Sequence, residues 1–217
     1  MKNITLILSV GFFTACSDND FDGDSQDNLA PAKTYVYECD QQFSFTARIE
    51  GEKVWLFLPS ETINLPHIPA ASGTKFSDGD SLFWTKGNEA MLEVNSVSYR
   101  TCKNNHSKAI WEHAKLNGVD FRALGNEPGW VLTIAEGNKV TFKSNYGQTI
   151  NKFIISPPVT NQNTHTTLYQ ASNKNHTILI ILEGTDCSDT MSGEAFETTV
   201  TVVLDDKEFN GCGKALH

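Results

Sequence analysis

Residues 34–58 read TYVYECDQQFSFTARIEGEKVWLFL, three short runs in which apolar and polar side chains alternate. Alternation with a period of two is typical of strands with one buried face, and Glu50-Gly51 marks a turn between two runs. The pattern continues over residues 62–68, 75–77, 81–86, 90–94 and 97–102. Seven or eight strands so close together predict a small antiparallel barrel over residues 34–105, because closure removes exposed strand edges.

Residues 107–117, SKAIWEHAKLN, predict a helix with Ser107 as N-cap and Gly118 as its stop. Its expected apolar face carries Ile110, Trp111, Ala114 and the stem of Lys115. We expect residues 106–118 to connect the barrel to a second small β-domain, residues 119–217. The strands expected there are residues 119–124, 130–135, 139–144, 151–156, 167–171, 176–183, 198–204 and 207–212.

A polar loop, residues 160–166, is expected to interrupt the strands of the second domain. The fold class predicted for the whole chain is therefore all-β: a small antiparallel barrel, a short helix and a second small β-domain.

The first 33 residues are predicted to lie outside the fold. Residues 1–15 combine Lys2, a short apolar run and two small residues, which indicates a secretory signal peptide. Phe13-Thr14-Ala15-Cys16 resembles a bacterial lipobox, which implies lipidation of Cys16; an ordinary secretory signal is the alternative. Ser17 follows the cysteine, and the resemblance then favours the periplasmic side of the outer membrane. Residues 16–33 are aspartate-rich and predict an acidic flexible tether.

The remaining four cysteines are an even number in a chain predicted to be exported, which indicates disulfides. Four cysteines allow three connectivities, and two early and two late positions favour Cys39–Cys102 and Cys187–Cys212. No CxxC motif and no His/Cys pair at zinc spacing occurs in the sequence, so no metal site and no cofactor are predicted.

The formal net charge of −9 argues against nucleic acid as a partner, because nucleic-acid binders present basic surfaces. The same charge favours a basic macromolecular partner. The sequence leaves the oligomeric state open.

Two segments carry a more specific pattern, ASGTKF at residues 71–76 and LFWTKGNEA at residues 82–90. Between the bracketing Cys39 and Cys102 they resemble the membrane-bound inhibitors of c-type lysozyme. That family has an SGxxY loop and a TKG-containing strand on an eight-stranded, disulfide-closed antiparallel barrel. The resemblance covers roughly residues 35–102. Phe76 stands where the family has tyrosine, which keeps the ring and removes the hydroxyl.

The resemblance implies a non-enzymatic protein whose partner is c-type lysozyme, with a contact surface formed by Ser72, Gly73, Phe76, Thr85 and Lys86. A c-type lysozyme acts through one protonated and one ionised carboxyl group. A serine hydroxyl can donate to the ionised group and accept from the protonated one, and a lysine ammonium is attracted to the ionised groups nearby. Glycine beside the serine permits a tight loop.

Three other interpretations compete with this one. Ser72-Gly73-Thr74-Lys75 fits the SxxK pattern of acyl-enzymes, but that pattern requires a helix start, and this segment lies among strands. Ser72-Gly73 also fits a plain turn, with Lys86 as a solvated residue. Phe83 and Trp84 could stack on carbohydrate, although one of two adjacent strand residues is expected to point into the barrel.

The second domain contains fewer sequence motifs that point to a function. FRALGNEPGW at residues 121–130, CSDTMSG at residues 187–193 and GCG at residues 211–213 resemble an envelope lipoprotein domain of unknown function. Glu127, Asp186 and Asp189 are the acids to consider for chemistry, and turn or cap duty is the favoured interpretation for them. A structural or sensory envelope protein that binds its ligand through this domain is therefore the alternative function.

Overall fold

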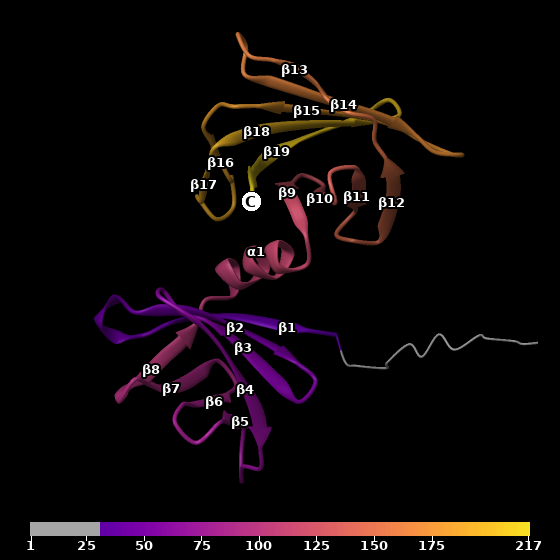
Figure 1. The fold of residues 1–217 in the computed structure, drawn as a ribbon. Coiled ribbons are helices and arrows are strands. Elements are labelled where there is room, and N and C mark those ends of the chain that lie inside the picture. The colour runs from indigo at the N-terminus through magenta and orange to yellow at the C-terminus, as the bar shows by residue number, and fades with distance from the viewer. Residues whose placement is uncertain (1–30) are drawn as a thin grey trace, which may run out of the picture.

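The computed structural model describes residues 31–217. The predicted signal peptide, the lipidation site Cys16 and most of the predicted tether lie outside the described residues. Within the described part, no helix combines the length and the apolar character needed to cross a membrane. Two β-domains joined by one helix account for the rest of the chain (Figure 1).

The first domain is a closed antiparallel barrel in which β1 to β8 pair in chain order and β8 returns to β1. This confirms the predicted barrel, and each of the expected runs forms a strand. The strands are β1 (Lys33–Glu38), β2 (Ser44–Glu50), β3 (Lys53–Phe57), β4 (Thr62–Ile68), β5 (Thr74–Ser77), β6 (Leu82–Lys86), β7 (Glu89–Val94) and β8 (Val97–Asn104), with a 3₁₀ turn at Asp40–Gln42.

Every second side chain of these strands enters the barrel core. Leu56, Phe76 and Phe83 are fully buried, whereas their neighbours along the strands are partly or largely exposed. In β1, Tyr37 is fully buried and its neighbour Val36 is buried as well. A disulfide joins Cys39, just after β1, to Cys102 in β8, as predicted. The covalent link therefore holds together the two strands that close the barrel.

One rim of the barrel gathers several of its connections. Lys33 at the start of β1 pairs with Ile49, and the hairpin after β2 leads to Lys53, which pairs with Pro66 near the end of β4. The loop between β4 and β5 follows directly. Because antiparallel strands alternate in direction, the entry of the chain into β1 and the β4–β5 loop lie on the same rim.

The helix α1 (His106–Leu116) follows β8 and packs along β1 and β9. Its N-cap is Asn105, whose side chain accepts a hydrogen bond from the backbone N–H of Lys108 at 3.1 Å. The prediction of Ser107 as N-cap is therefore wrong. The predicted apolar face also needs correction, because Ala109 and Trp111 are buried while Ile110 remains exposed.

The second domain is a nine-stranded antiparallel sheet in the order β12-β11-β10-β9-β19-β18-β15-β14-β13, with a separate hairpin of β16 and β17. β12, at one end of the sheet, lies close to β14 near the other end, since the Asn173 side chain, just after β14, donates to the backbone oxygen of Lys152 at 3.2 Å. The strands are β9 (Val119–Asn126), β10 (Gly129–Ala135), β11 (Lys139–Ser144), β12 (Thr149–Ile154), β13 (Val159–Asn161), β14 (Thr166–Ser172), β15 (Thr177–Glu183), β16 (Cys187–Ser188), β17 (Ala195–Phe196), β18 (Thr198–Leu204) and β19 (Lys207–Ala215).

All eight strands predicted for this domain are present. The expected polar loop at residues 160–166 is only partly a loop, because residues 159–161 form the short strand β13 and pair with β14. A core separate from that of the barrel fills the inner face of this sheet, with Trp130, Phe142 and Ile180 among its members. The second predicted disulfide, Cys187–Cys212, joins β16 to β19.

Candidate functional site

The Ser72 loop, residues 69–73, connects β4 to β5 and lies directly against β6. Gly73 adopts a left-handed backbone conformation with φ of +69°, which an L side chain rarely adopts. A Cβ atom at Gly73 would come within 2.5 Å of the Thr85 backbone oxygen and 2.9 Å of Trp84 Nε1. Glycine is therefore required here both for the backbone conformation and for the close approach of the loop to β6.

Trp84 fixes the outer side of this loop. Its indole Nε1–H donates to the backbone oxygen of Ser72 at 2.9 Å, while 36% of the residue stays exposed. The register of β5 and β6 pairs Thr74 with Thr85, so Ser72 and Gly73 reach the end of β6 where Lys86 stands. The structure thus brings the predicted Ser72, Gly73 and Lys86 together on neighbouring elements.

Lys86 is the last residue of β6, and its side chain is exposed. Gly87 follows with φ of +60° and turns the chain into β7, where Glu89 pairs with Lys86. Within residues 31–217 the ammonium group of Lys86 takes part in no ion pair. Its charge is consequently available to a carboxylate that approaches from outside.

Thr85 and Phe76 lie on the inner side of the same strands. The Thr85 hydroxyl is hydrogen-bonded to Tyr37 Oη at 2.5 Å, and burial raises the pKa of Tyr37 to about 12. Phe76 is 0% exposed, with its ring stacked on Phe83 and edge-on to His67. The structure therefore places these two predicted contact residues in the barrel interior, beneath the surface that carries the Ser72 loop.

A hollow of about 220 Å³ adjoins Lys86 on the outer face of the barrel. Trp84, Met91 and Arg100 line it together with Lys86, and Glu89 contributes one carboxylate. Sequence reasoning singled out Trp84 only as a possible stacking residue and missed Arg100 and Tyr37. Only the strand register could have revealed them, because no local motif connects them to Ser72.

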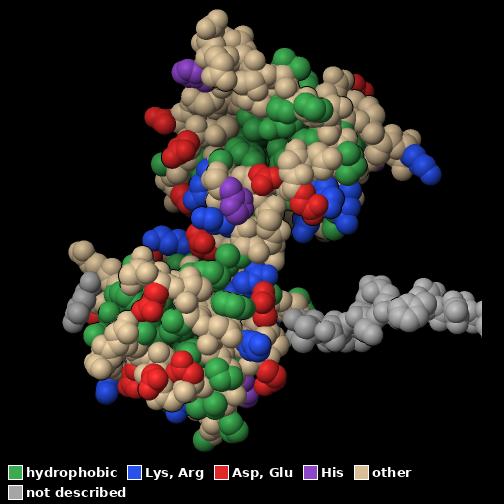
Figure 2. Space-filling view, viewed as in Figure 1, with side chains coloured by type: hydrophobic (Ala, Val, Ile, Leu, Met, Phe, Trp, Pro, Cys, Tyr) green, Lys and Arg blue, Asp and Glu red, His purple; other side chains and the backbone are tan. Residues whose placement is uncertain are grey.

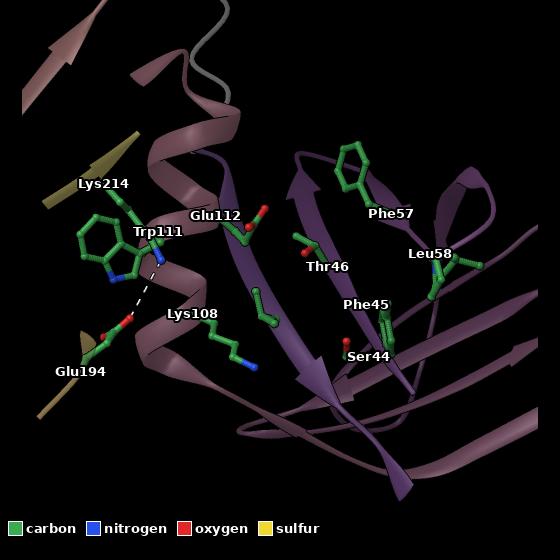
Figure 3. A pocket seen from close by; sticks show the side chains of 12 residues that line it. Ser44, Phe45, Thr46, Phe57, Leu58, Lys108, Trp111, Glu112, Glu194 and Lys214 are labelled. Atoms are coloured by element: carbon green, nitrogen blue, oxygen red, sulfur yellow. Dashed lines mark ion pairs between the residues drawn. The ribbon is translucent and has the colours of Figure 1, made fainter. Parts of the chain in front are cut away.

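A second cavity, about 510 Å³, lies where the two domains meet (Figure 3). Lys214 sits 4.7 Å from the centre of the Trp111 ring and forms an ion pair with Glu194 at 4.0 Å. Lys108 is likewise paired with Glu38. Figure 2 shows basic side chains gathered at this junction. Because Lys108 and Lys214 already have partners within the chain, we interpret the lining of this cavity as part of the contact between the domains.

Asp189, one of the acids singled out in the second domain, has hydrogen-bond partners that indicate a structural role. Burial alone would raise the pKa of Asp189, but hydrogen bonds from Ser192, Asn126 and Met191 outweigh it and leave that pKa below its usual value. Asp189 thus caps the turn at residues 189–193, in agreement with the favoured interpretation. Within residues 31–217, no three His, Cys, Asp or Glu side chains are placed to hold a metal ion together.

Comparison with known proteins bears on the first domain. Residues 37–100 match the family model described as membrane-bound lysozyme-inhibitor of c-type lysozyme. A protein of Yersinia enterocolitica named membrane-bound lysozyme inhibitor of C-type lysozyme is 48% identical over 42 residues, which is 19% of this chain and 36% of the relative. The match therefore spans about a third of the relative's length.

No solved structure matches the chain significantly. The resemblance inferred from the motifs is confirmed for one part of the chain: residues 37–100, which carry both the Ser72 loop and Lys86, are similar to the membrane-bound inhibitors of c-type lysozyme.

Proposed function

We propose that this protein inhibits c-type lysozyme, and that its first domain inserts the Ser72 loop and Lys86 into the active-site cleft of the enzyme. One observation carries the proposal: an exposed serine lies beside an exposed lysine that forms no ion pair within residues 31–217, and both belong to the segment that matches the inhibitor family. Trp84 and Gly73 hold the serine loop against the strand that bears the lysine.

The chemistry of a glycoside hydrolase explains why these two groups suffice. One carboxyl group of the enzyme is kept protonated as general acid, and the other is ionised. The Ser72 hydroxyl can accept a hydrogen bond from the protonated group and donate one to the ionised group. The ammonium of Lys86 adds a charge-assisted bond to a carboxylate in the cleft. Both enzymatic groups would then be occupied without any reaction.

The Ser72 loop is ordered before it binds. The indole of Trp84 is hydrogen-bonded to the loop backbone, and Gly73 lies so close to β6 that a side chain there would clash with it. A loop that is ordered before binding loses less conformational entropy on association, which favours tight binding. The acidic net charge of −9 would in addition accelerate encounter with a basic lysozyme.

The proposal includes the location of the protein. Lipidation of Cys16 after removal of residues 1–15 would anchor the chain at the periplasmic side of the outer membrane. Growth with labelled palmitate should label the wild-type chain and leave the Cys16→Ala variant unlabelled. Membrane fractionation should recover the variant in the soluble fraction, and an unlabelled wild-type chain would contradict this part of the proposal.

The inhibition itself is tested with purified protein and a lysozyme assay on peptidoglycan suspensions. We expect Ser72→Ala and Lys86→Ala each to weaken inhibition by about 1–4 kcal/mol, or roughly 5-fold to 1000-fold. Ser60→Ala, at the opposite end of β4, and Lys115→Ala, on the exposed side of α1, are the matched controls. A wild-type chain that inhibits no c-type lysozyme would refute the proposal.

A further inference from the structure

The second domain carries a hollow of about 490 Å³ on its surface. The side chains of Leu124, Val131, Tyr146 and Met191 line it, together with the single charged residue Lys143. Tyr146 is 82% exposed and Met191 81% exposed. Large apolar residues that stay exposed around a concave surface are typical of a binding site, because burial elsewhere would lower the free energy of the fold.

Tyr146 is held in place at the cost of backbone strain. It lies in the turn between β11 and β12 with φ of +56°, a region that bulky residues rarely occupy. Its backbone N–H donates to the Gly129 oxygen at 2.9 Å. A Cβ atom at Gly129 would come within 2.7 Å of the Tyr146 ring, so the ring rests where glycine has no side chain. Such strain concentrates at ligand sites.

The other wall of the hollow is also fixed. The Cys187–Cys212 disulfide ties the start of the loop at residues 187–193 to β19. The Asn126 side chain donates to the Asp189 carboxylate at 2.7 Å and to the Thr190 hydroxyl at 3.1 Å. The loop that carries Thr190 and Met191 is therefore pinned to β9, and the hollow has two ordered walls.

A second, smaller hollow of about 240 Å³ adjoins the first, since Gly125 and Asn126 line both. Ser188, Thr190 and Asn210 supply uncharged polar side chains there. The Thr190 hydroxyl accepts its bond from Asn126, so its own proton is left to donate. The second hollow is also lined by the Asp189 carboxylate, whose oxygens already accept bonds from Asn126 and Ser192. The two hollows together therefore combine an aromatic ring and apolar walls with hydrogen-bonding groups that are mostly neutral.

We infer that this double hollow binds a neutral oligosaccharide. A pyranose has an apolar C–H face, which suits the ring of Tyr146, and a rim of hydroxyls, which suits Thr190, Ser188 and Asn126. An anionic ligand finds only Lys143 as a cation in these walls. An apolar peptide would fill the first hollow and leave the polar groups of the second without partners, which costs free energy.

The experiment uses the full chain and three neutral trisaccharides: N-acetylchitotriose, cellotriose and maltotriose. Calorimetric titration measures the affinity, and saturation-transfer NMR identifies the sugar protons in contact with the protein. We expect saturable binding of at least one of them. Tyr146→Ala should weaken it at least about 10-fold, the factor expected for a central aromatic contact. Tyr146→Phe keeps the ring and should stay within about 3-fold of wild type.

Two further variants keep the result interpretable. Thr190→Val, which keeps the shape and removes the hydroxyl, should weaken binding by several-fold. Ile154→Ala changes an exposed apolar residue of β12 that lines neither hollow, and it should bind like wild type. Circular dichroism and urea denaturation of Tyr146→Ala, compared with wild type, would show whether the variant is folded. Unchanged lysozyme inhibition would show that this site is separate from the Ser72 loop.

The inference fails if none of the trisaccharides binds saturably at millimolar concentration. It also fails if Tyr146→Ala and Tyr146→Phe weaken binding equally, because the contact would then depend on the hydroxyl and not on the ring. Binding that Tyr146→Ala leaves intact would place the sugar elsewhere and overturn the assignment. None of these results bears on inhibition, so the two proposals stand or fall separately.

Discussion

At the scale of single residues, Trp84 has the most consequential placement in the first domain. It is the only tryptophan of the described barrel whose indole N–H bonds to the Ser72 loop, and it reaches that loop from the adjacent strand. Trp55, on β3, is exposed to a similar extent, 40% against 36%, and has no such bond. The pair therefore allows loop support to be separated from surface hydrophobicity.

We predict that Trp84→Phe weakens lysozyme inhibition about 5-fold, because one hydrogen bond contributes about 1 kcal/mol. The ring remains, so the free energy of unfolding should change little. Trp55→Phe should leave inhibition unchanged. Inhibition constants and urea denaturation of both variants check this, and equal inhibition by both would mean that Trp84 does not position Ser72.

Tyr37 links the same region to pH. In an unfolded chain a tyrosine ionises near pH 10, whereas burial raises the pKa of Tyr37 to about 12. The neutral, buried side chain of Tyr37 contributes to the free energy of unfolding in full below pH 10. This contribution is lost as the pH rises to 12, by up to about 3 kcal/mol. The fall in unfolding free energy over this range should be smaller in Tyr37→Phe. Denaturation curves at matched pH values measure the difference, and parallel curves would contradict the prediction.

Residue-level prediction from sequence succeeded where the local motif determines the position. Ser72 and Gly73 occupy a loop, and Lys86 ends a strand before a glycine, so their exposure follows from the motif alone. Phe76 and Thr85 were expected at the contact surface but point inward. Whether a strand residue faces the core or the solvent depends on the strand register, and a short sequence motif contains no information about that register.

At the scale of elements, α1 shows how a cap is selected. Asn105 and Ser107 are both suitable caps, and they are two positions apart in the sequence. Asn105 is preferred because its amide also reaches Glu38 on β1, at 3.2 Å, while its oxygen accepts from Lys108. A tertiary contact thus moves the N-cap of the helix two residues earlier than local preference predicts.

We predict that Asn105→Ala lowers the free energy of unfolding by about 1 kcal/mol, the usual value of an N-cap. Ser107→Ala should stay within about 0.5 kcal/mol of wild type, since Ser107 is exposed within the first turn. Guanidinium denaturation compares the two, and the reverse order would show that Ser107 is the effective cap.

Strands were predictable from sequence because most of them are half-buried and alternate in polarity. The exceptions are instructive: β13 spans three residues, Val159–Asn161, all exposed. Such a strand has no buried face to leave a period of two in the sequence, and only its pairing with β14 creates it. The order of strands, in which β19 inserts between β9 and β18, likewise depends on long-range pairing.

At the scale of the whole molecule, the net charge of the chain is negative, whereas the exposed side chains at the candidate site include positive ones. The chain carries −9 in total, while the candidate site presents Lys86 with Arg100 nearby. We predict that the association rate constant with a basic lysozyme falls at least about 10-fold between low salt and 0.5 M salt, because added ions screen long-range attraction. Stopped-flow kinetics measure it. A rate constant independent of salt would exclude electrostatic steering.

The Ser72 loop and the start of β1 lie on the same rim of the barrel, and this placement limits the space that a bound lysozyme can occupy. The chain enters β1 at Lys33 on the rim that also bears the Ser72 loop. With Cys16 held by lipid, as proposed, a lysozyme would have to fit between this rim and the bilayer. A chain of 17 residues reaches at most about 58 Å, and a compact domain of typical size, about 100–150 residues, is roughly 33–38 Å across. If residues 16–33 serve as the tether predicted from the sequence, deleting about ten of them should abolish inhibition at a membrane surface yet preserve it in solution.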